Sequence, residues 1–368
     1  MAFNWQQSDW PHFRYKLDKI EDLLFEFVQR TGRISGILEG LPEDAKIETL
    51  IETMVAEAIK TSEIEGEYLN QKDVASSIRK NLGLNTELVS VRDKKAEGIA
   101  ELMVDVRNTF NEKFTENKLF DWNRMILGGT TGVKSGKYRI HEDPMQVVSG
   151  PLGKEKIHFE APPSSAVPFE MKRFIQWFNE SAPGESKEIK KPVIRAAIAH
   201  LYFESIHPFE DGNGRVGRAI SEKALSQEVK RPVFLSLSKA IELKKNDYHS
   251  ALEKGQRSNE ITSWISYFIQ TVLEAQKLAE AQIDFTLKKS KFFYQFENKL
   301  NDRQKKVIAR MFDEGPDGFE GGMNARKYMA ITKTSKATAT RDLQDLVALN
   351  VLIAAGGGRS TRYEIRLL

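Results

Sequence analysis

One segment, residues 207–218, constrains the fold more than any other part of the sequence. It reads His-Pro-Phe-Glu-Asp-Gly-Asn-Gly-Arg-Val-Gly-Arg and follows residues 195–206, whose apolar positions have helical spacing. Pro208 ends that helix, because the residue before a proline is biased away from the α region. Gly212 and Gly214 then permit backbone conformations that are closed to larger residues. The sequence therefore predicts a helix, a tight turn and a second helix, with reactive side chains at the turn.

The turn has the residue types of an anion-binding site. Backbone N–H groups around Asn213 can point into one concavity at the start of the second helix, where the helix dipole adds about half a positive charge. Arg215 and Arg218 are three residues apart, so both can face the same anion. Because several oxygens must be bound at once, a polyphosphate fits better than a single carboxylate.

Two further side chains add chemistry to this site. Asp211 is a suitable Mg²⁺ ligand, since that ion usually takes one or two carboxylates together with phosphate oxygens. His207 is placed to remove a proton from an incoming hydroxyl at neutral pH. A histidine before such a turn is more often structural, but the coherent segment favours nucleotide-dependent group transfer. A zinc site that includes His200 and Glu204 is disfavoured, because the His-Glu-x-x-His spacing is absent.

Most of the remaining sequence is predicted to be helical. Apolar residues recur at steps of three and four over residues 17–28, 47–61, 72–82, 89–112, 167–181 and 192–206, and again from residue 214 to about residue 300. Glycines and prolines interrupt short apolar runs between residues 128 and 163, which predicts a β-hairpin or an irregular flap there. The first 280 residues are therefore expected to form a helical protein with one small β insertion.

The last 68 residues, 301–368, have a different pattern. Three helical stretches precede two short strands around a glycine turn, which is the order of a winged helix-turn-helix. This gives a predicted division into an N-terminal helical region, a catalytic core, a linker helix and a winged helix, at residues 1–115, 116–280, 281–300 and 301–368. The fold class is therefore mainly α.

The composition is that of an ordinary globular protein. Hydrophobic residues make up 40% and charged residues 29% of the 368 positions, enough for two or three domains. Cysteine is absent, which excludes disulfide and thiolate chemistry. The start of the sequence lacks a signal-peptide pattern, and no apolar run approaches the roughly 20 residues needed to cross a bilayer. We therefore expect a cytoplasmic protein without a membrane partner.

Residues 207–218 resemble the HPFx(D/E)GNGRxxR signature of Fic-domain proteins at every fixed position. Residues 136–139 resemble the lead-in to the family's flap and residues 145–159 the flap itself, while Trp5 and Trp10 resemble the N-terminal extension of bacterial Fic proteins. The resemblance covers about residues 1–280. It implies a Fic-type helical bundle that transfers AMP from ATP to a Ser, Thr or Tyr hydroxyl of a target protein. Transfer of UMP or phosphocholine, as in other Fic proteins, stays open, as does a homodimeric state.

The resemblance also implies roles for individual residues. His207 would deprotonate the acceptor hydroxyl, and Asp211 would hold Mg²⁺ on the α and β phosphates. Arg215 and Arg218 would neutralise the β and γ phosphates. The cradle for the phosphates would consist of Gly212, Asn213 and Gly214. Looser matches suggest that Tyr202, Tyr248, His249 and Gln256 line an adenosine pocket. Packing of these side chains in the core is an equally good interpretation.

The flap is expected to bind the target. An exposed hairpin edge offers unpaired N–H and C=O groups, so an extended segment of the target could pair with it. The predicted contact residues are Val148, Ser149, Gly150, His158 and Phe159. Residues 150–156 lengthen the hairpin relative to the family pattern, which leaves target preference open.

The segment Thr61-Ser-Glu-Ile-Glu-Gly66 is either an exposed acidic helix end or an inhibitory element. It matches the (S/T)xxxE(G/N) inhibitory motif of Fic proteins at Thr61, Glu65 and Gly66. By this resemblance, Glu65 would pair with Arg218 and occupy the space of the γ phosphate. In related proteins the same glutamate helps to remove AMP, so the direction of the reaction stays open.

The tail leads to a rival hypothesis, a DNA-binding transcription regulator whose Fic portion senses a nucleotide. Residues 301–368 hold 12 Lys and Arg against 8 Asp and Glu, and Asp342 and Asp345 interrupt the exposed face of the third tail helix. The candidate DNA contacts are Lys336, Thr338 and Arg341 on that helix and Arg359 and Arg362 on the wing.

Overall fold

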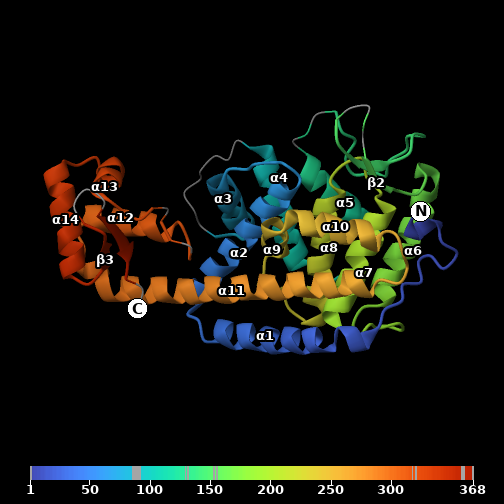
Figure 1. Cartoon of the computed structure of the whole chain (residues 1–368), viewed down its shortest axis with the longest axis horizontal. Coiled ribbons are helices and arrows are strands. Elements are labelled where there is room, and N and C mark those ends of the chain that lie inside the picture. Colours follow the sequence, from blue (N-terminus) through green and yellow to red (C-terminus); the bar gives the residue numbers. More distant parts are fainter. Residues whose placement is uncertain are drawn as a thin grey trace. The chain divides into compact units, whose positions relative to one another are not determined.

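The computed structural model describes residues 2–84, 93–128, 130, 132–151, 154, 156–316, 318–319, 321–357 and 361–366. The chain divides into two compact units, one of Met1–Ser35 with Leu50–Ala279 and one of Gly36–Thr49 with Glu280–Leu368. Both are mainly helical, as the apolar spacing predicts (Figure 1). Within the described residues, no helix combines the length and apolar character needed to span a bilayer.

The first unit contains most of the helices. They are α1 (Glu21–Glu39), α2 (Glu43–Ile64), α3 (Gln71–Asn81), α4 (Lys94–Asn108), α5 (Glu116–Leu127), α6 (Val167–Glu180), α7 (Pro192–Ile206), α8 (Asn213–Glu228), α9 (Leu237–Leu243), α10 (Lys245–Gly255) and α11 (Thr262–Phe296), of which α1, α2 and α11 also contribute residues to the second unit. Short 3₁₀ segments lie at Asn4–Gln6, Leu17–Lys19 and Ser164–Ala166. The other helices begin and end close to the expected stretches, but α1 runs from Glu21 to Glu39 instead of over residues 17–28, and α5 was not predicted.

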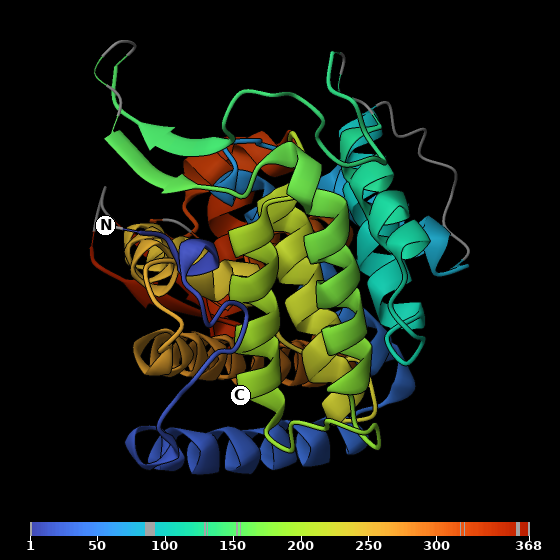
Figure 2. The same cartoon turned by 90° about the vertical axis from the view of Figure 1, so that its right-hand side faces the viewer.

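Helix α7 forms the centre of this unit. Every residue from Val193 to Ile206 is buried, so the helix is surrounded by other elements on all sides. Helix α8 packs along it, and Figures 1 and 2 show the two helices side by side, with α6 next to α7. The turn between α7 and α8 is therefore held at one end of a rigid helical pair.

The flap is a two-stranded antiparallel hairpin, as predicted. Strand β1 (Gln146–Ser149) pairs with β2 (Lys156–Glu160), and the register shifts between Val147 and Val148. Figure 2 shows the hairpin projecting from the helices. Its β2 strand is anchored by Phe159, whose ring packs edge-on against Phe3 with centroids 5.0 Å apart. Phe159 is therefore an apolar anchor for β2.

The second unit has the predicted order of elements. Helices α12 (Asp302–Phe312), α13 (Ala325–Thr332) and α14 (Lys336–Ala348) are followed by an antiparallel hairpin of β3 (Leu352–Ala355) and β4 (Arg362–Ile365). A 3₁₀ turn, Glu297–Lys299, precedes them. These elements enclose a core of their own that includes Phe292, Val307 and Leu343. The winged-helix assignment itself stays a prediction.

One expectation for this unit was wrong. Asp342 does not interrupt the exposed face of α14, because it is 2% exposed and lies within the core. Its carboxylate accepts hydrogen bonds from Arg303 Nε at 2.8 Å and from the Tyr328 hydroxyl at 2.9 Å. Burial alone would raise the pKa of Asp342, but these partners outweigh burial and lower that pKa. The buried charge is therefore paired and hydrogen-bonded, as a charge at this depth requires.

The candidate DNA-contact residues differ in exposure. Lys336, Arg341 and Arg362 are exposed. Thr338 is half-buried, and its backbone N–H and hydroxyl both face Ser335, the residue that caps α14. Arg359 lies outside the described residues.

Candidate active site

The turn between α7 and α8 has the geometry that its sequence requires. His207 ends α7 in the left-handed conformation with φ of 50°, and Gly212 precedes α8 with φ of 85°. Arg139 secures the turn from outside, since its Nε donates to the His207 carbonyl at 2.8 Å. The turn is therefore anchored both by its own backbone and by a buried arginine.

Asn213 shapes this turn with its side chain. Its Oδ1 accepts the Phe209 N–H and its Nδ2 donates to the Phe209 carbonyl, both at 2.9 Å. The resemblance implies a phosphate contact for Asn213, but in this structure the amide is occupied by Phe209. Phosphate binding at this position would fall to the backbone N–H groups.

The turn brings two buried arginines together at the start of α8. Arg215 is 3% exposed and Arg218 is 1% exposed. Arg215 Nε and Arg218 Nη1 have no hydrogen-bond partner among the described residues. Buried polar groups are normally hydrogen-bonded, so unpaired guanidinium donors at a helix N-terminus indicate a site for an anion.

Arg218 is held by residues 61–66 at the end of α2. Its Nε donates to the Thr61 hydroxyl at 2.8 Å, and its Nη2 donates to Glu65 Oε1 at 2.8 Å. Gly66, with φ of 81°, ends this segment. Burial would raise the pKa of Glu65, but the charge and hydrogen bond of Arg218 together with the charges of Arg215 and His249 outweigh burial and lower that pKa, so the carboxylate is charged at neutral pH.

The Glu65 carboxylate also lies against the start of α8. A Cβ atom at Gly214 would overlap Glu65 Oε1, so only glycine leaves room for this contact. The carboxylate thus occupies the helix N-terminus where the sequence predicts an anion.

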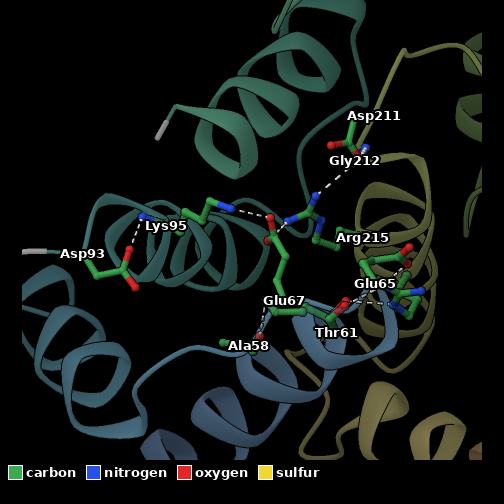
Figure 3. A network of polar contacts seen from close by, with 11 residues as sticks. Ala58, Thr61, Glu65, Glu67, Asp93, Lys95, Asp211, Gly212 and Arg215 are labelled. Atoms are coloured by element: carbon green, nitrogen blue, oxygen red, sulfur yellow. Dashed lines mark hydrogen bonds and ion pairs between the residues drawn. The ribbon is translucent and has the colours of Figure 1, made fainter. Parts of the chain in front are cut away.

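A second carboxylate, which the sequence analysis missed, pairs with the other arginine. Glu67 is ion-paired with Arg215 Nη1, and Lys95 Nζ from α4 holds the other Glu67 oxygen at 2.7 Å. Asp211 Oδ1 lies 3.5 Å from Arg215 Nη2. Figure 3 shows Glu67 between Lys95 and Arg215. An acidic residue directly after Gly66 was visible in the sequence, but its partner on α4 was not.

The His207 side chain lies near Glu204, the residue one turn earlier on α7. Its Nδ1 is 3.6 Å from Glu204 Oε2, and the imidazole is 19% exposed. The ring is therefore reachable from solvent with a carboxylate close to one nitrogen. His200 is fully buried and engaged elsewhere, with its Nε2 2.7 Å from the Tyr248 hydroxyl.

Asp211 fits a Mg²⁺ ligand by its chemistry. Its carboxylate is 47% exposed, and one oxygen accepts the Gly212 N–H. A single outward carboxylate beside two buried arginines would suit an ion that takes its other ligands from phosphate and water.

The predicted adenosine-pocket residues do not all face this site. Tyr202 packs in the core, its ring 5.1 Å from Trp10. Tyr248 is buried against His200, and Gln256 Nε2 donates to the Glu204 carbonyl at 3.1 Å. These three residues are placed as the packing interpretation expects. His249 is exposed on α10. Partial desolvation of the ring lowers the pKa of His249, and the nearby Glu65 charge offsets part of this lowering.

The flap residues also divide into two groups. Val148 is 47% exposed, and Ser149 and Gly150 are exposed beside it. His158 is half-buried. Phe159 is 1% exposed, so the expectation that its side chain contacts a target is corrected: the ring is the apolar anchor of the flap.

Comparisons with known proteins find a family match that covers this turn. Residues 113–225, which include the whole turn, match the Fic/DOC family. The chain contains a Fic domain. Residues 3–84, which include Glu65, match a domain of unknown function, DUF4172. The Fic domain therefore follows a separately recognised N-terminal region.

Named relatives of the Fic domain match only part of this chain. The Nematostella vectensis protein adenylyltransferase Fic is 25% identical over 165 residues, 44% of this chain and 34% of the relative. The Caenorhabditis elegans protein adenylyltransferase fic-1 is 28% identical over 125 residues, 34% of this chain and 22% of the relative. The chain thus matches about a third or less of the length of these relatives.

Solved structures show the same fold. A Fic family protein from Desulfovibrio desulfuricans covers 97% of this chain and 98% of its own, at 18% identity and a TM-score of 0.56. A Fic-domain protein from Bacteroides thetaiotaomicron covers 71% of this chain and 95% of its own, at 19% identity and a TM-score of 0.52.

Proposed function

We propose that this chain transfers AMP from ATP to a Ser, Thr or Tyr hydroxyl of a target protein. The observation that carries the proposal is the pair of buried arginines with unpaired N–H groups beside His207, at the start of α8. The protein adenylyltransferases among the relatives support AMP as the transferred group.

The residues of the turn divide the chemistry between them. His207 would accept the proton of the attacking hydroxyl, with Glu204 holding its other nitrogen. Arg215, Arg218 and the α8 N-terminus would bind the phosphates and stabilise charge on the leaving pyrophosphate. Asp211 would hold Mg²⁺, which when bound supplies further positive charge at the phosphates.

We further propose that the site is autoinhibited. Glu65 occupies Arg218 and the α8 N-terminus, while Glu67 occupies Arg215. Nucleotide phosphates must therefore compete with a carboxylate for each arginine. A coupling of about 1–3 kcal/mol corresponds to about 5–150-fold suppression of productive binding.

The flap is the proposed docking edge for the target. Three apolar side chains lie exposed on it, Val147 at 41%, Val148 at 47% and Ile157 at 45%. Exposed apolar residues on a two-stranded hairpin fit an extended segment that adds as a further strand.

Incorporation of labelled ATP tests both AMP transfer and autoinhibition by Glu65. We expect Glu65→Gly to raise self-incorporation of AMP by about 5–150-fold over the wild type. His207→Ala in the Glu65→Gly background should abolish incorporation on every residue for which His207 is the base. Glu63→Gly is the matched control, because Glu63 lies in the same helical turn but pairs with Lys60 instead of Arg218. Equal incorporation by wild type and Glu65→Gly would refute autoinhibition by Glu65. No incorporation by Glu65→Gly would refute AMP transfer.

Mass spectrometry of Glu65→Gly incubated with a nucleotide mixture identifies the donor, since the added mass gives the transferred group. An AMP-modified target incubated with the wild type tests the reverse reaction. Removal of AMP would mean that this chain also catalyses the reverse reaction.

Exposed Lys336, Arg341 and Arg362 favour a second candidate function, DNA binding by the C-terminal unit. A gel shift with random genomic fragments tests it. Binding that Lys336→Glu weakens, together with no AMP incorporation in any variant, would favour the transcription regulator over the transferase.

A further inference from the structure

Three side chains near the tip of the flap form a continuous hydrogen-bonded array. Ser149 Oγ on β1 lies 2.6 Å from His158 Nε2 on β2. The other nitrogen, His158 Nδ1, lies 2.8 Å from Glu253 Oε2 on α10. A hydroxyl, an imidazole and a carboxylate are therefore joined in series across three elements.

The charge state of Glu253 sets the direction of these hydrogen bonds. The hydrogen bond from His158 is the main cause that lowers the pKa of Glu253, so the group is a carboxylate and accepts the Nδ1 proton. In the neutral ring, Nε2 then carries a lone pair and accepts the Ser149 hydroxyl proton. This is the order of nucleophile, base and orienting group that activates a serine.

The array is open to reagents. Ser149 is exposed at the end of β1, while the side chains of His158 and Glu253 are 26% and 31% exposed. The Ser149 hydroxyl is therefore accessible from solvent.

The array is also tied to the catalytic turn from two sides. Arg139 bonds to the His207 carbonyl and to the carbonyl of Pro162, which follows β2. On the other side, Arg257 Nη2 donates to the His158 carbonyl at 2.8 Å, and its neighbour Gln256 donates to the Glu204 carbonyl. The flap and the proposed AMP-transfer site thus share both supports.

We propose that Ser149 is a self-modification site that accepts AMP, with His158 as its base and Glu253 as a positioning residue. The proposal rests on the proposed function, since ATP bound at the α8 N-terminus supplies the AMP. The Ser149 oxygen attacks the α-phosphorus, an Oγ–P bond forms and the P–O bond to pyrophosphate breaks. The hydroxyl proton passes to His158 Nε2, and pyrophosphate leaves.

Hydroxyl reactivity is tested first without ATP. A fluorophosphonate forms an Oγ–P bond with an activated serine and releases fluoride, independently of AMP transfer. We expect peptide mapping of the wild type to find the label on Ser149, and labelling of His158→Ala to be at least about a hundredfold slower, the scale of general-base assistance. Ser250, an exposed serine on α10, is the matched internal control.

An array that merely fastens the flap would give different results. Ser149 labelled no faster than Ser250 would overturn the proposal, and so would equal labelling of wild type and His158→Ala. Should His158→Ala fail to fold, Glu253→Gln replaces it, with an expected slowing of about tenfold or more because the ring loses its orientation.

AMP is then mapped in the Glu65→Gly variant incubated with Mg²⁺ and ATP. We expect AMP on Ser149 and loss of that modified peptide in the Glu65→Gly, Ser149→Ala double variant. Incorporation on other hydroxyls with Ser149 unmodified would overturn this proposal and leave the proposed function intact. No incorporation on any residue would overturn both, while fluorophosphonate labelling still reports separately on the hydroxyl.

Discussion

Glu67 is ion-paired with Arg215, whose guanidinium is buried at the start of α8. The neighbouring carboxylate, Glu65, is ion-paired with Arg218 three residues further along the same helix. Each arginine of the proposed phosphate site therefore has its own acidic partner from one short segment. The segment acts on both arginines, whereas the resemblance to the family's inhibitory motif implies contact with one.

Glu67→Gln should raise the affinity for Mg·ATP, because the substitution removes the charge that competes for Arg215. An effect of about 1 kcal/mol corresponds to about fivefold tighter binding, and it should add to the effect of Glu65→Gly. Isothermal titration calorimetry of both single variants and the double variant measures it. Weaker binding by Glu67→Gln would mean that Glu67 positions Arg215 instead of competing for it.

The contact between Glu65 and Gly214 predicts a non-additive pair of substitutions. Gly214→Ala should destabilise the wild type by about 1–3 kcal/mol, since the added methyl group overlaps the Glu65 carboxylate. In the Glu65→Gly background that overlap is gone, and the same substitution should cost less. Urea unfolding of the four proteins gives the interaction free energy. Equal costs in both backgrounds would contradict the contact.

The Glu65 and Arg218 pair predicts a pH-dependent stability difference. The pKa of Glu65 is lowered in the folded protein, so the pair stabilises the fold at pH above the unfolded pKa of about 4.3. That stabilisation is lost as the pH falls through the folded pKa. The free energy of unfolding of the wild type should therefore exceed that of Glu65→Gln at pH 7, and the difference should shrink on acidification. A difference that does not change with pH would contradict the pairing.

Asp342 predicts a large stability effect in the C-terminal unit. Asp342→Asn should destabilise it by about 1–3 kcal/mol, because the hydrogen bonds from Arg303 and Tyr328 lose their charged acceptor. Asp345→Asn is the matched control, since Asp345 is exposed on the same helix and should change stability by no more than about 0.5 kcal/mol. Thermal unfolding monitored by circular dichroism measures both. Similar effects of the two substitutions would contradict the buried network.

Local spacing in the sequence determined most of the helices and the two hairpins. Steps of three and four residues predict α2, α7 and α14, because one apolar stripe is enough to define a helix and its buried face. Helix α5 carries the same spacing at Leu119, Trp122 and Ile126, but it was missed. The turn between α7 and α8 could also be predicted, since Pro208 ends the first helix and Gly212 and Gly214 permit a tight turn.

The resemblance implied the pair of Glu65 and Arg218, but only the tertiary structure decided which other charges meet. Lys95 lies on α4, Glu67 follows α2 and Arg215 lies on α8. No local spacing in the sequence relates these three residues. Ser149, His158 and Glu253 likewise come from separate segments. Asp342 was expected to face solvent, but in the structure it lies in the core and pairs with Arg303. The physical reason is that helix periodicity depends on neighbours within one or two turns, while the pairing of a buried charge depends on side chains that packing brings from distant segments.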